Sequence, residues 1–252
     1  MVREFEIAPE ARPPLATLRD ARELRLPHRY ATDVWDRPFR SRLASLLHPD
    51  GEVLDIGAGR RPTVGPEDRP DGTRYVGLDL DADELKKAPP GSYDDTVVAP
   101  AEERVPSLED RFDLVLSFFA LEHVSSTARV LENARAYLRP GGWLLAQTAG
   151  SRSPFAIGNR ILPPRIAQLV LQRTQSRDAD AIFPARYDQC RYSALTALLD
   201  DWSEHEVVPL FTGAGYALFS RALTVAYVAY EEWIYRTGRR DLAPYYLVAA
   251  RR

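Results

Sequence analysis

Short apolar runs alternate with polar breaks through the middle of the chain, and each run has the length of one buried strand. The runs cover residues 53–56, 75–78, 112–117 and 143–148, with a weaker one at 96–98. Between the last two long runs, apolar residues recur at helical spacing, namely Val130, Leu131, Ala134 and Leu138. Strands that alternate with helical segments indicate an α/β fold with a mostly parallel sheet.

Beyond Thr148 the pattern becomes helical. Residues 153–170 carry apolar positions at helical spacing, and residues 174–180 are polar and predict a loop. A further helix is expected through residues 194–199, with Ser193 as a possible N-cap. These segments predict a helical insert, or lid, after the fifth strand.

The final part of the chain predicts two more strands, at residues 204–210 and 245–250, around a long helix at 216–235. One face of that helix would carry large apolar residues, namely Phe219, Leu223, Tyr227, Tyr230 and Ile234. At the other end of the chain, residues 1–27 predict an extended arm. Residues 28–47 predict a helix that is split or kinked at Pro38.

Composition narrows the function classes. The chain has 252 residues, of which 45% are hydrophobic and 27% charged, and a net charge of −3. One domain with a full core is therefore expected, and nucleic acid is not an expected partner. A single cysteine, Cys190, predicts neither disulfides nor a thiolate metal cluster. No secretion signal or membrane-spanning segment is evident, so we expect a cytoplasmic protein without stable membrane insertion.

The run Val53-Leu54-Asp55-Ile56-Gly57-Ala58-Gly59 carries the candidate chemistry. It reads as a buried strand entering a glycine turn, and a second strand at 75–79 ends in Asp79. Glycines let backbone amides approach a nucleoside-bearing ligand, and a carboxylate can accept from two ribose hydroxyls. The nicotinamide fingerprint fits less well, because Pro62 stands where its third glycine would be.

The order Asp-x-Gly-x-Gly resembles motif I of class I S-adenosylmethionine-dependent methyltransferases, and Asp79 stands at that family's acidic position. The strings FDLVLSFFALEHV, from Phe112, and LRPGGWLLAQ, from Leu138, look like the family's fourth- and fifth-strand signatures. In the second string, residues 139–142 predict a turn. The resemblance covers about residues 50–150.

The resemblance implies a doubly wound, mostly parallel seven-stranded sheet whose last strand runs antiparallel beside the sixth. Residues 1–50 would form an N-terminal arm and lid helix. Residues 51–150 would form the cofactor-binding, Rossmann-like half. Residues 151–252 would supply the insert helices on the acceptor side and the last two strands of the same domain.

By the same resemblance, the cofactor is S-adenosylmethionine and the product S-adenosylhomocysteine. Its contacts fall on the glycine turn (Asp55, Gly57, Ala58 and Gly59), on Asp79 for the ribose and on Leu80 for the adenine. Relatives often place an acid after the third strand, where this chain has Pro100. The Ala101 amide and Glu102 are therefore expected to replace that contact. Ser117 and Phe118 would contact the methionine moiety. A cap of the turn is the alternative role for Asp55.

His123 is the leading catalytic candidate, because a neutral imidazole can accept a proton near pH 7. The alternative is that Glu122 and His123 cap the following helix. Tyr187 is a secondary candidate with its neighbour Asp188, and the alternative for both is a surface loop. No carboxylates gather at the ends of the fourth and fifth strands, so we expect no catalytic metal.

The leading hypothesis is a metal-independent methyltransferase for a small apolar or aromatic metabolite of secondary metabolism, with O-methylation favoured. Nine aromatic residues between Phe211 and Tyr246 suit a roof over such an acceptor, but they equally suit a core or a dimer face. The oligomeric state is expected to be monomer or homodimer. Two alternatives remain: a cofactor-binding enzyme that cyclises or decarboxylates without moving methyl, and an inactive binding module. Methylation of protein or nucleic acid ranks lower.

Overall fold

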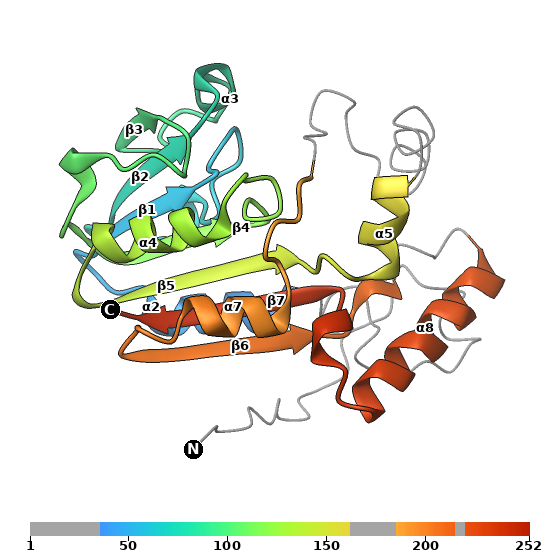
Figure 1. The fold of residues 1–252 in the computed structure, drawn as a ribbon. Coiled ribbons are helices and arrows are strands. Elements are labelled where there is room, and N and C mark those ends of the chain that lie inside the picture. The colour runs from blue at the N-terminus through green and yellow to red at the C-terminus, as the bar shows by residue number, and fades with distance from the viewer. Residues whose placement is uncertain (1–35, 162–184, 215–219) are drawn as a thin grey trace.

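The computed structural model describes residues 36–161, 185–214 and 220–252, which form a doubly wound α/β domain (Figure 1). Its seven-stranded sheet has the order β3-β2-β1-β4-β5-β7-β6. The strands are β1 (Glu52–Ile56), β2 (Arg74–Asp79), β3 (Asp95–Val98), β4 (Phe112–Phe118), β5 (Leu138–Ala149), β6 (Glu204–Leu210) and β7 (Tyr245–Arg251).

The first five strands pair in parallel, and β7 runs antiparallel between β5 and β6. The chain winds outward from β1 in one direction through β2 and β3, and in the other direction through β4 and β5. The loops after β1 and β4 therefore diverge at the carboxyl edge of the sheet, where ligands bind in open α/β folds. This architecture confirms the predicted fold.

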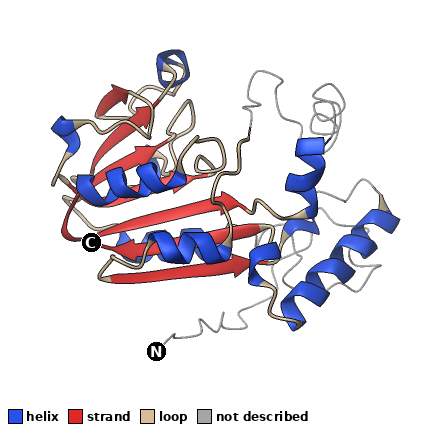
Figure 2. Ribbon diagram, in the orientation of Figure 1, coloured by secondary structure: helices blue, strands red, loops and turns tan. Residues whose placement is uncertain are grey.

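Helices cover both faces of the sheet (Figure 2). The α-helices are α2 (Arg37–Leu46), α3 (Ala82–Lys86), α4 (Thr127–Tyr137), α5 (Pro154–Ile161), α7 (Tyr192–Leu198) and α8 (Arg221–Arg236). The described residues also form three short 3-10 turns: η2 (Pro66–Asp68), η3 (Pro106–Leu108) and η6 (Arg240–Leu242). Helices α4 and α7 lie on one face, and α2 packs behind β5 on the other.

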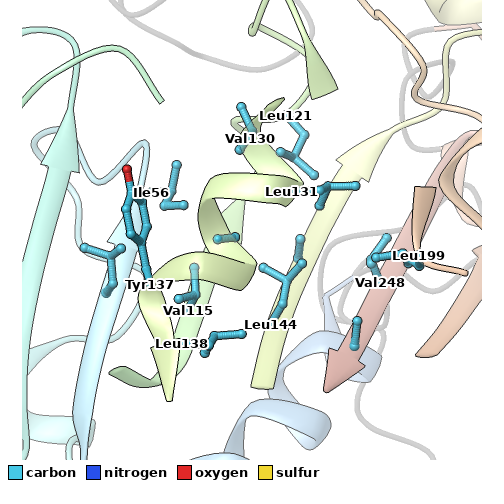
Figure 3. Close-up of a cluster of buried hydrophobic side chains, with 14 of the residues drawn as sticks. Ile56, Val115, Leu121, Val130, Leu131, Tyr137, Leu138, Leu144, Leu199 and Val248 are labelled. Atoms are coloured by element: carbon cyan, nitrogen blue, oxygen red, sulfur yellow. The ribbon is translucent and has the colours of Figure 1, made fainter. Parts of the chain in front are cut away.

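Two hydrophobic clusters form because successive strand residues point to opposite faces. In β1, Leu54 and Ile56 join the cluster under α4, whereas Val53 joins the one under α2. Figure 3 shows the first cluster, in which Val130 and Leu131 of α4 meet the strand residues. The apolar residues whose helical spacing predicted α4 therefore lie on the face that this helix buries.

Several boundaries differ from those predicted. Residues 139–142 belong to β5 rather than to a turn, because Gly141 and Gly142 pair with Arg252 through backbone hydrogen bonds of 3.1 and 3.0 Å. Gly141 still has a φ of +84°, so the glycine makes an irregularity within the strand. Pro38, by contrast, lies in the first turn of α2, where proline is well tolerated, which agrees with the predicted split at this residue.

The predicted N-cap of α7 is wrong. Arg191 occupies the cap position, and Asp241 of η6 accepts hydrogen bonds from the Ser193 N–H and hydroxyl at 2.7 and 2.8 Å. In the described residues helix α8 begins after Ser220, whose side chain caps it by accepting from the Leu223 amide. Its buried residues include Thr224 and Ile234, whereas Leu223 is 50% exposed, so the predicted apolar face was only partly right.

Some predictions fall outside the described residues: the arm at 1–27, the part of the leading helix before residue 36, most of the insert (162–184), and the 216–219 start of the long helix. No helix in the described ranges is long and apolar enough to cross a membrane.

Candidate active site

The glycine turn after β1 lies at the point where the sheet reverses its winding. Gly57 has a φ of +76° and Gly59 a φ of +50°, a region that glycine enters without strain. The Gly57 and Ala58 amides donate to the Leu78 carbonyl of β2 at 2.8 and 3.2 Å. A β-carbon on Gly57 would lie 2.4 Å from Cβ of Ala120, which follows β4. The turn and the loop after β4 therefore touch.

Asp55 is fully buried beneath this turn. Its carboxylate accepts from the Thr63 amide and hydroxyl, both at 2.8 Å, and from the Tyr75 hydroxyl at 2.7 Å. Burial raises the pKa of Asp55 to about 6, although these hydrogen bonds oppose the rise. Asp55 thus holds the loop after β1, which is the capping role considered from the sequence. Its predicted contact with a cofactor amine stays a prediction.

Asp79 at the end of β2 joins the glycine turn directly. Its Oδ2 accepts from the Gly59 amide and its Oδ1 from the Asp81 amide, each at 2.9 Å. Partial burial raises the pKa of Asp79 above its usual value. The next residue, Leu80, is 69% exposed and presents apolar surface beside the carboxylate. The structure therefore brings together Gly59, Asp79 and Leu80 at the carboxyl edge of β1 and β2.

Tyr93 is a site residue that was not among those predicted from the sequence. Its hydroxyl donates to the carbonyls of Ala58 and Gly59 at 2.9 and 3.0 Å, and so fixes the glycine turn from below. A β-carbon on Gly77 would lie 2.8 Å from the Tyr93 ring. An isolated glycine inside a strand often marks such a close approach, and Gly77 was the signal in the sequence.

An ion pair braces the same loop from the side. Arg60 donates through two nitrogens to both oxygens of Glu84 in α3, each at 2.6 Å. The Arg60 guanidinium, assisted by the Lys87 ammonium, lowers the pKa of Glu84 to about 2. The segment after the glycines is therefore tied to the helix that follows Asp79.

Glu102 bridges the loops after β3 and β4. Its Oε1 accepts from the Ser125 amide at 2.6 Å and from the Ser125 hydroxyl at 2.8 Å. Partial burial opposes ionisation, but these hydrogen bonds outweigh it and the pKa of Glu102 lies below its usual value. The neighbouring Ala101 carbonyl accepts from Asn133 of α4 at 2.9 Å. Both predicted residues therefore line the edge of the site, and their cofactor contacts stay predictions.

The end of β4 is aromatic. The Phe118 ring lies 4.7 Å from Phe39 of α2 and 4.8 Å from Phe119, measured between ring centroids. Phe119 has a φ of +56°, a strained conformation for a bulky residue, and its amide donates to the Gln147 carbonyl at 2.8 Å. Ser117 is buried, and within the described ranges its hydroxyl has no hydrogen-bond partner. A buried hydroxyl without a partner and a strained backbone both cost free energy, and such features are common at functional sites.

Glu122 and His123 do not cap the following helix, because the Ser126 side chain takes that role by accepting from the Arg129 amide. Glu122 is buried, accepts from the Thr148 hydroxyl at 2.9 Å, and has a pKa raised by its burial. His123 is half-buried in the turn directly after β4. Its position at the carboxyl edge agrees with the sequence, and its chemical role stays a prediction.

Tyr187 and Asp188 are not on a surface loop. Tyr187 is 5% exposed and has a φ of +51°, and its amide donates to the Glu122 carbonyl at 2.9 Å. Arg160 of α5 places its guanidinium 5.1 Å from the Tyr187 ring. Asp188 accepts from the amide of Thr127, the first residue of α4, at 2.9 Å. This segment therefore packs between the insert and the loop after β4.

Metal ligands do not cluster in the described ranges, where no group of three or more His, Cys, Asp or Glu side chains could hold an ion. Cys190 is buried, and its burial raises the pKa of the thiol to about 12.

A family model described as a methyltransferase domain matches residues 26–219. Ubiquinone biosynthesis O-methyltransferase of Nitrobacter winogradskyi is 29% identical over 151 residues, which are 57% of this chain and 56% of that protein. The match thus spans only about half the length of this curated relative.

Two solved structures show the same fold. Geranyl diphosphate C-methyltransferase of Streptomyces coelicolor, in complex with Mg²⁺, geranyl diphosphate and S-adenosylhomocysteine, has a TM-score of 0.53 at 16% identity, over 89% of this chain and 78% of that one. Phosphoethanolamine N-methyltransferase 2 of Haemonchus contortus, in complex with S-adenosylmethionine, has a TM-score of 0.50 at 16% identity, over 86% of this chain and 52% of that one.

Proposed function

The chain belongs to the class I S-adenosylmethionine-dependent methyltransferase family, and from this premise we propose that it transfers a methyl group to the oxygen of a small apolar or aromatic molecule. One observation carries the proposal: the Asp79 carboxylate and the glycine turn meet at 2.9 Å at the point where the sheet reverses its winding. A carboxylate next to a glycine turn, where the ligand can come close to the backbone, suits the ribose of a nucleoside-bearing cofactor.

The residues present fit that cofactor. Each oxygen of Asp79 accepts one backbone N–H, and a carboxylate has about four acceptor sites, so both oxygens can also accept from ribose hydroxyls. The exposed Leu80 offers an apolar surface for the adenine. The Ala101 amide and Glu102 would bind the adenine edge, and Ser117 and Phe118 the methionine moiety. Asp55 and Tyr93 would hold the turn that Gly57, Ala58 and Gly59 form.

S-adenosylmethionine supplies, when bound, a methyl group that is already electrophilic because its sulfur is positively charged. The chain must therefore hold the acceptor in line with that methyl group and exclude water. Positioning of this kind can lower a barrier by about 7–11 kcal/mol. Phe118, Phe119 and Phe39 give the end of β4 an apolar wall suited to that task.

His123 would accept the proton of the acceptor hydroxyl as a general base. It lies in the turn after β4, and its partner in sequence, Glu122, anchors that turn by accepting from the Thr148 hydroxyl. A general base contributes about 10²–10⁴-fold in rate, less than positioning can supply. Tyr187 is the secondary candidate. Because it is buried, it would act by shaping the pocket or by donating its hydroxyl to a bound acceptor.

The O-methyltransferase named among the relatives supports oxygen as the acceptor atom, whereas the two structural neighbours are named as C- and N-methyltransferases. The proposal also includes a metal-independent reaction, a cytoplasmic location, and a monomeric or homodimeric state. The non-methylating enzyme and the inactive module remain the alternatives to be separated by experiment.

The test is incubation of the purified protein with S-adenosylmethionine labelled on the methyl group and a panel of phenols, catechols and aliphatic alcohols. We expect the label in an extractable product, S-adenosylhomocysteine in equal amount, and no loss of activity with EDTA. An acceptor that is consumed while the cofactor stays intact would favour cyclisation or decarboxylation. Cofactor binding with no acceptor consumed would favour the inactive module, and loss of activity with EDTA would contradict metal independence.

A further inference from the structure

A pocket lined with arginines lies away from the loops that carry the predicted cofactor residues. Its volume is about 420 Å³, within the range of small-molecule sites. Three parts of the chain form it: the loop after β5, the first turn of α7, and the segment that runs from just after α8 through η6. The lining residues are Arg152, Tyr192, Gly238, Arg239, Arg240, Asp241 and Leu242.

The lining carries a surplus of two positive charges, because three arginines face one aspartate. That aspartate is already engaged. Asp241 accepts from the Ser193 amide and hydroxyl at 2.7 and 2.8 Å, and its Oδ2 pairs with Arg152 at 3.2 Å. Its charge therefore serves the start of α7 and one of the three arginines, Arg152.

Arg239 and Arg240 are held by aromatic rings instead of by carboxylates. The Arg239 guanidinium lies 4.8 Å from the Trp233 ring, and that of Arg240 lies 5.1 Å from the Tyr192 ring. Arg240 also donates to the Tyr192 hydroxyl at 2.7 Å. Within the described ranges, neither guanidinium forms an ion pair with a carboxylate. Stacking on a ring face leaves the N–H edge of an arginine directed away from the ring.

A simpler role, compensation of the helix dipole, is met by another arginine. Arg236 lies in the last turn of α8, where a cation is favourable, and it pairs with Glu232 at 3.4 Å. Arg239 and Arg240 follow the helix, beyond Gly238, and face the pocket. Compensation of the helix dipole therefore does not explain the position of these two arginines, whereas binding of a ligand would.

We propose that this pocket binds a phosphate group, either as the free anion or as a monoester of a small molecule. A phosphate monoester carries about −1.5 to −2 charges at pH 7, which matches the surplus of the lining. Its oxygens accept paired hydrogen bonds from guanidinium groups. Carboxylates accept the same paired hydrogen bonds, so this geometry alone does not distinguish the two kinds of ligand. Charge distinguishes the two, because a single carboxylate would leave one arginine uncompensated.

Calorimetric titration of the whole chain at pH 7.5 and constant ionic strength tests the proposal, with inorganic phosphate, phenyl phosphate and acetate as separate ligands. We expect saturable binding of phosphate and much weaker binding of acetate. Tighter binding of phenyl phosphate would identify a monoester as the preferred form, and equal or weaker binding would identify the free anion. Absence of saturable binding by both phosphates, or acetate bound as tightly, would overturn the proposal.

The double substitution Arg239→Gln/Arg240→Gln should weaken phosphate binding about tenfold or more, because hydrogen bonds to charged groups are among the stronger ones. Arg236→Gln is the matched control, since it removes an arginine charge outside the pocket, and it should leave the affinity unchanged. Equal losses in both variants would mean a diffuse electrostatic effect and would also overturn the site. Circular dichroism melting checks that both variants are folded.

Discussion

At the scale of the residue, the proposed cofactor site depends most on Asp79. We expect Asp79→Asn to weaken binding of S-adenosylmethionine about tenfold or more, because a hydrogen bond to a charged group is worth about 1.5–3 kcal/mol. Asp83→Asn is a suitable control: Asp83 lies further along the chain and pairs with Lys86 on the exposed side of α3. Calorimetry measures both, and an Asp79→Asn variant with unchanged affinity would exclude the ribose role.

Substitution of His123 distinguishes an effect on the chemical step from an effect on cofactor binding. If its imidazole is the general base, His123→Ala should lower kcat by about 10²-fold or more while the affinity for S-adenosylmethionine stays within about twofold. Turnover that survives the substitution would leave His123 a structural role only.

Gly57 shows why glycine is needed at the turn. Gly57→Ala would place a β-carbon 2.4 Å from that of Ala120 and would also force alanine to a φ of +76°. Gly91 has a φ of +80°, but nothing lies within 4 Å of the position that a β-carbon would take there, so Gly91→Ala isolates the backbone cost of about 1–2 kcal/mol. Thermal unfolding should rank Gly57→Ala well below Gly91→Ala, and equal losses would mean that Ala120 yields without cost.

The residues that could be located from the sequence are those whose role is local. Gly57 and Gly59 come soon after β1 and Asp79 is the last residue of β2, and their motif alone placed them at one edge of the sheet. Tyr93 was missed, and the sequence did not indicate that Tyr187 is buried, because the contacts of both residues are made far along the chain. Tyr93 reaches back 34 residues to the Gly59 carbonyl, and Tyr187 packs against the turn of Glu122. Gly77 signals a close approach, but a single sequence does not say which side chain makes it.

At the scale of the element, α3 and the loop after β1 depend on the pair Arg60–Glu84. Because the pKa of Glu84 is lowered to about 2 in the folded state, the pair stabilises the fold fully above about pH 4.5 and progressively less as the pH falls towards 2. Glu84→Gln should therefore be less stable than the unsubstituted protein at pH 7, with a difference that shrinks by pH 3.5. Urea unfolding at several pH values measures it, and a constant difference would contradict the ion pair's contribution.

Asp55 has the opposite effect on how the stability of the fold depends on pH. Its pKa is raised to about 6 in the folded state, so the folded protein binds more protons than the unfolded chain between about pH 4 and 6. Its contribution to stability falls as the pH rises through that window. The two carboxyl groups can be told apart by the direction of their pH dependence.

Some element boundaries were predictable from the sequence. The bounds of β6, 204–210, agree with those read from the sequence. The start of α7 was not predictable, because Asp241, which holds its first turn, lies 48 residues away from Ser193. The predicted turn at 139–142 failed for a related reason: the partner that holds it in β5 is Arg252, which only the folded sheet brings near.

At the scale of the whole molecule, position in the sheet sets tolerance to substitution. Val248 of β7, a strand paired on both sides, is fully buried, whereas Val98 of the edge strand β3 is 55% exposed. Val248→Asp should prevent stable folding, because a buried unpaired charge costs several kcal/mol. Val98→Asp should change stability by about 0.5 kcal/mol or less. Soluble yield and melting curves compare the stability of the two variants. Equal stability of the two would contradict the observed strand order.

The insertion of β7 between β5 and β6 has a consequence for biosynthesis. During translation, β1 to β5 can associate as they leave the ribosome, since each of β2 to β5 pairs with a strand already made. Strand β6 cannot, because its hydrogen-bonded neighbour is residues 245–251. Until those residues emerge, β5 and β6 both present open edges to other nascent chains. Expression of this protein should therefore benefit from chaperones that shield strand edges, and slow synthesis near residue 210 should increase aggregation.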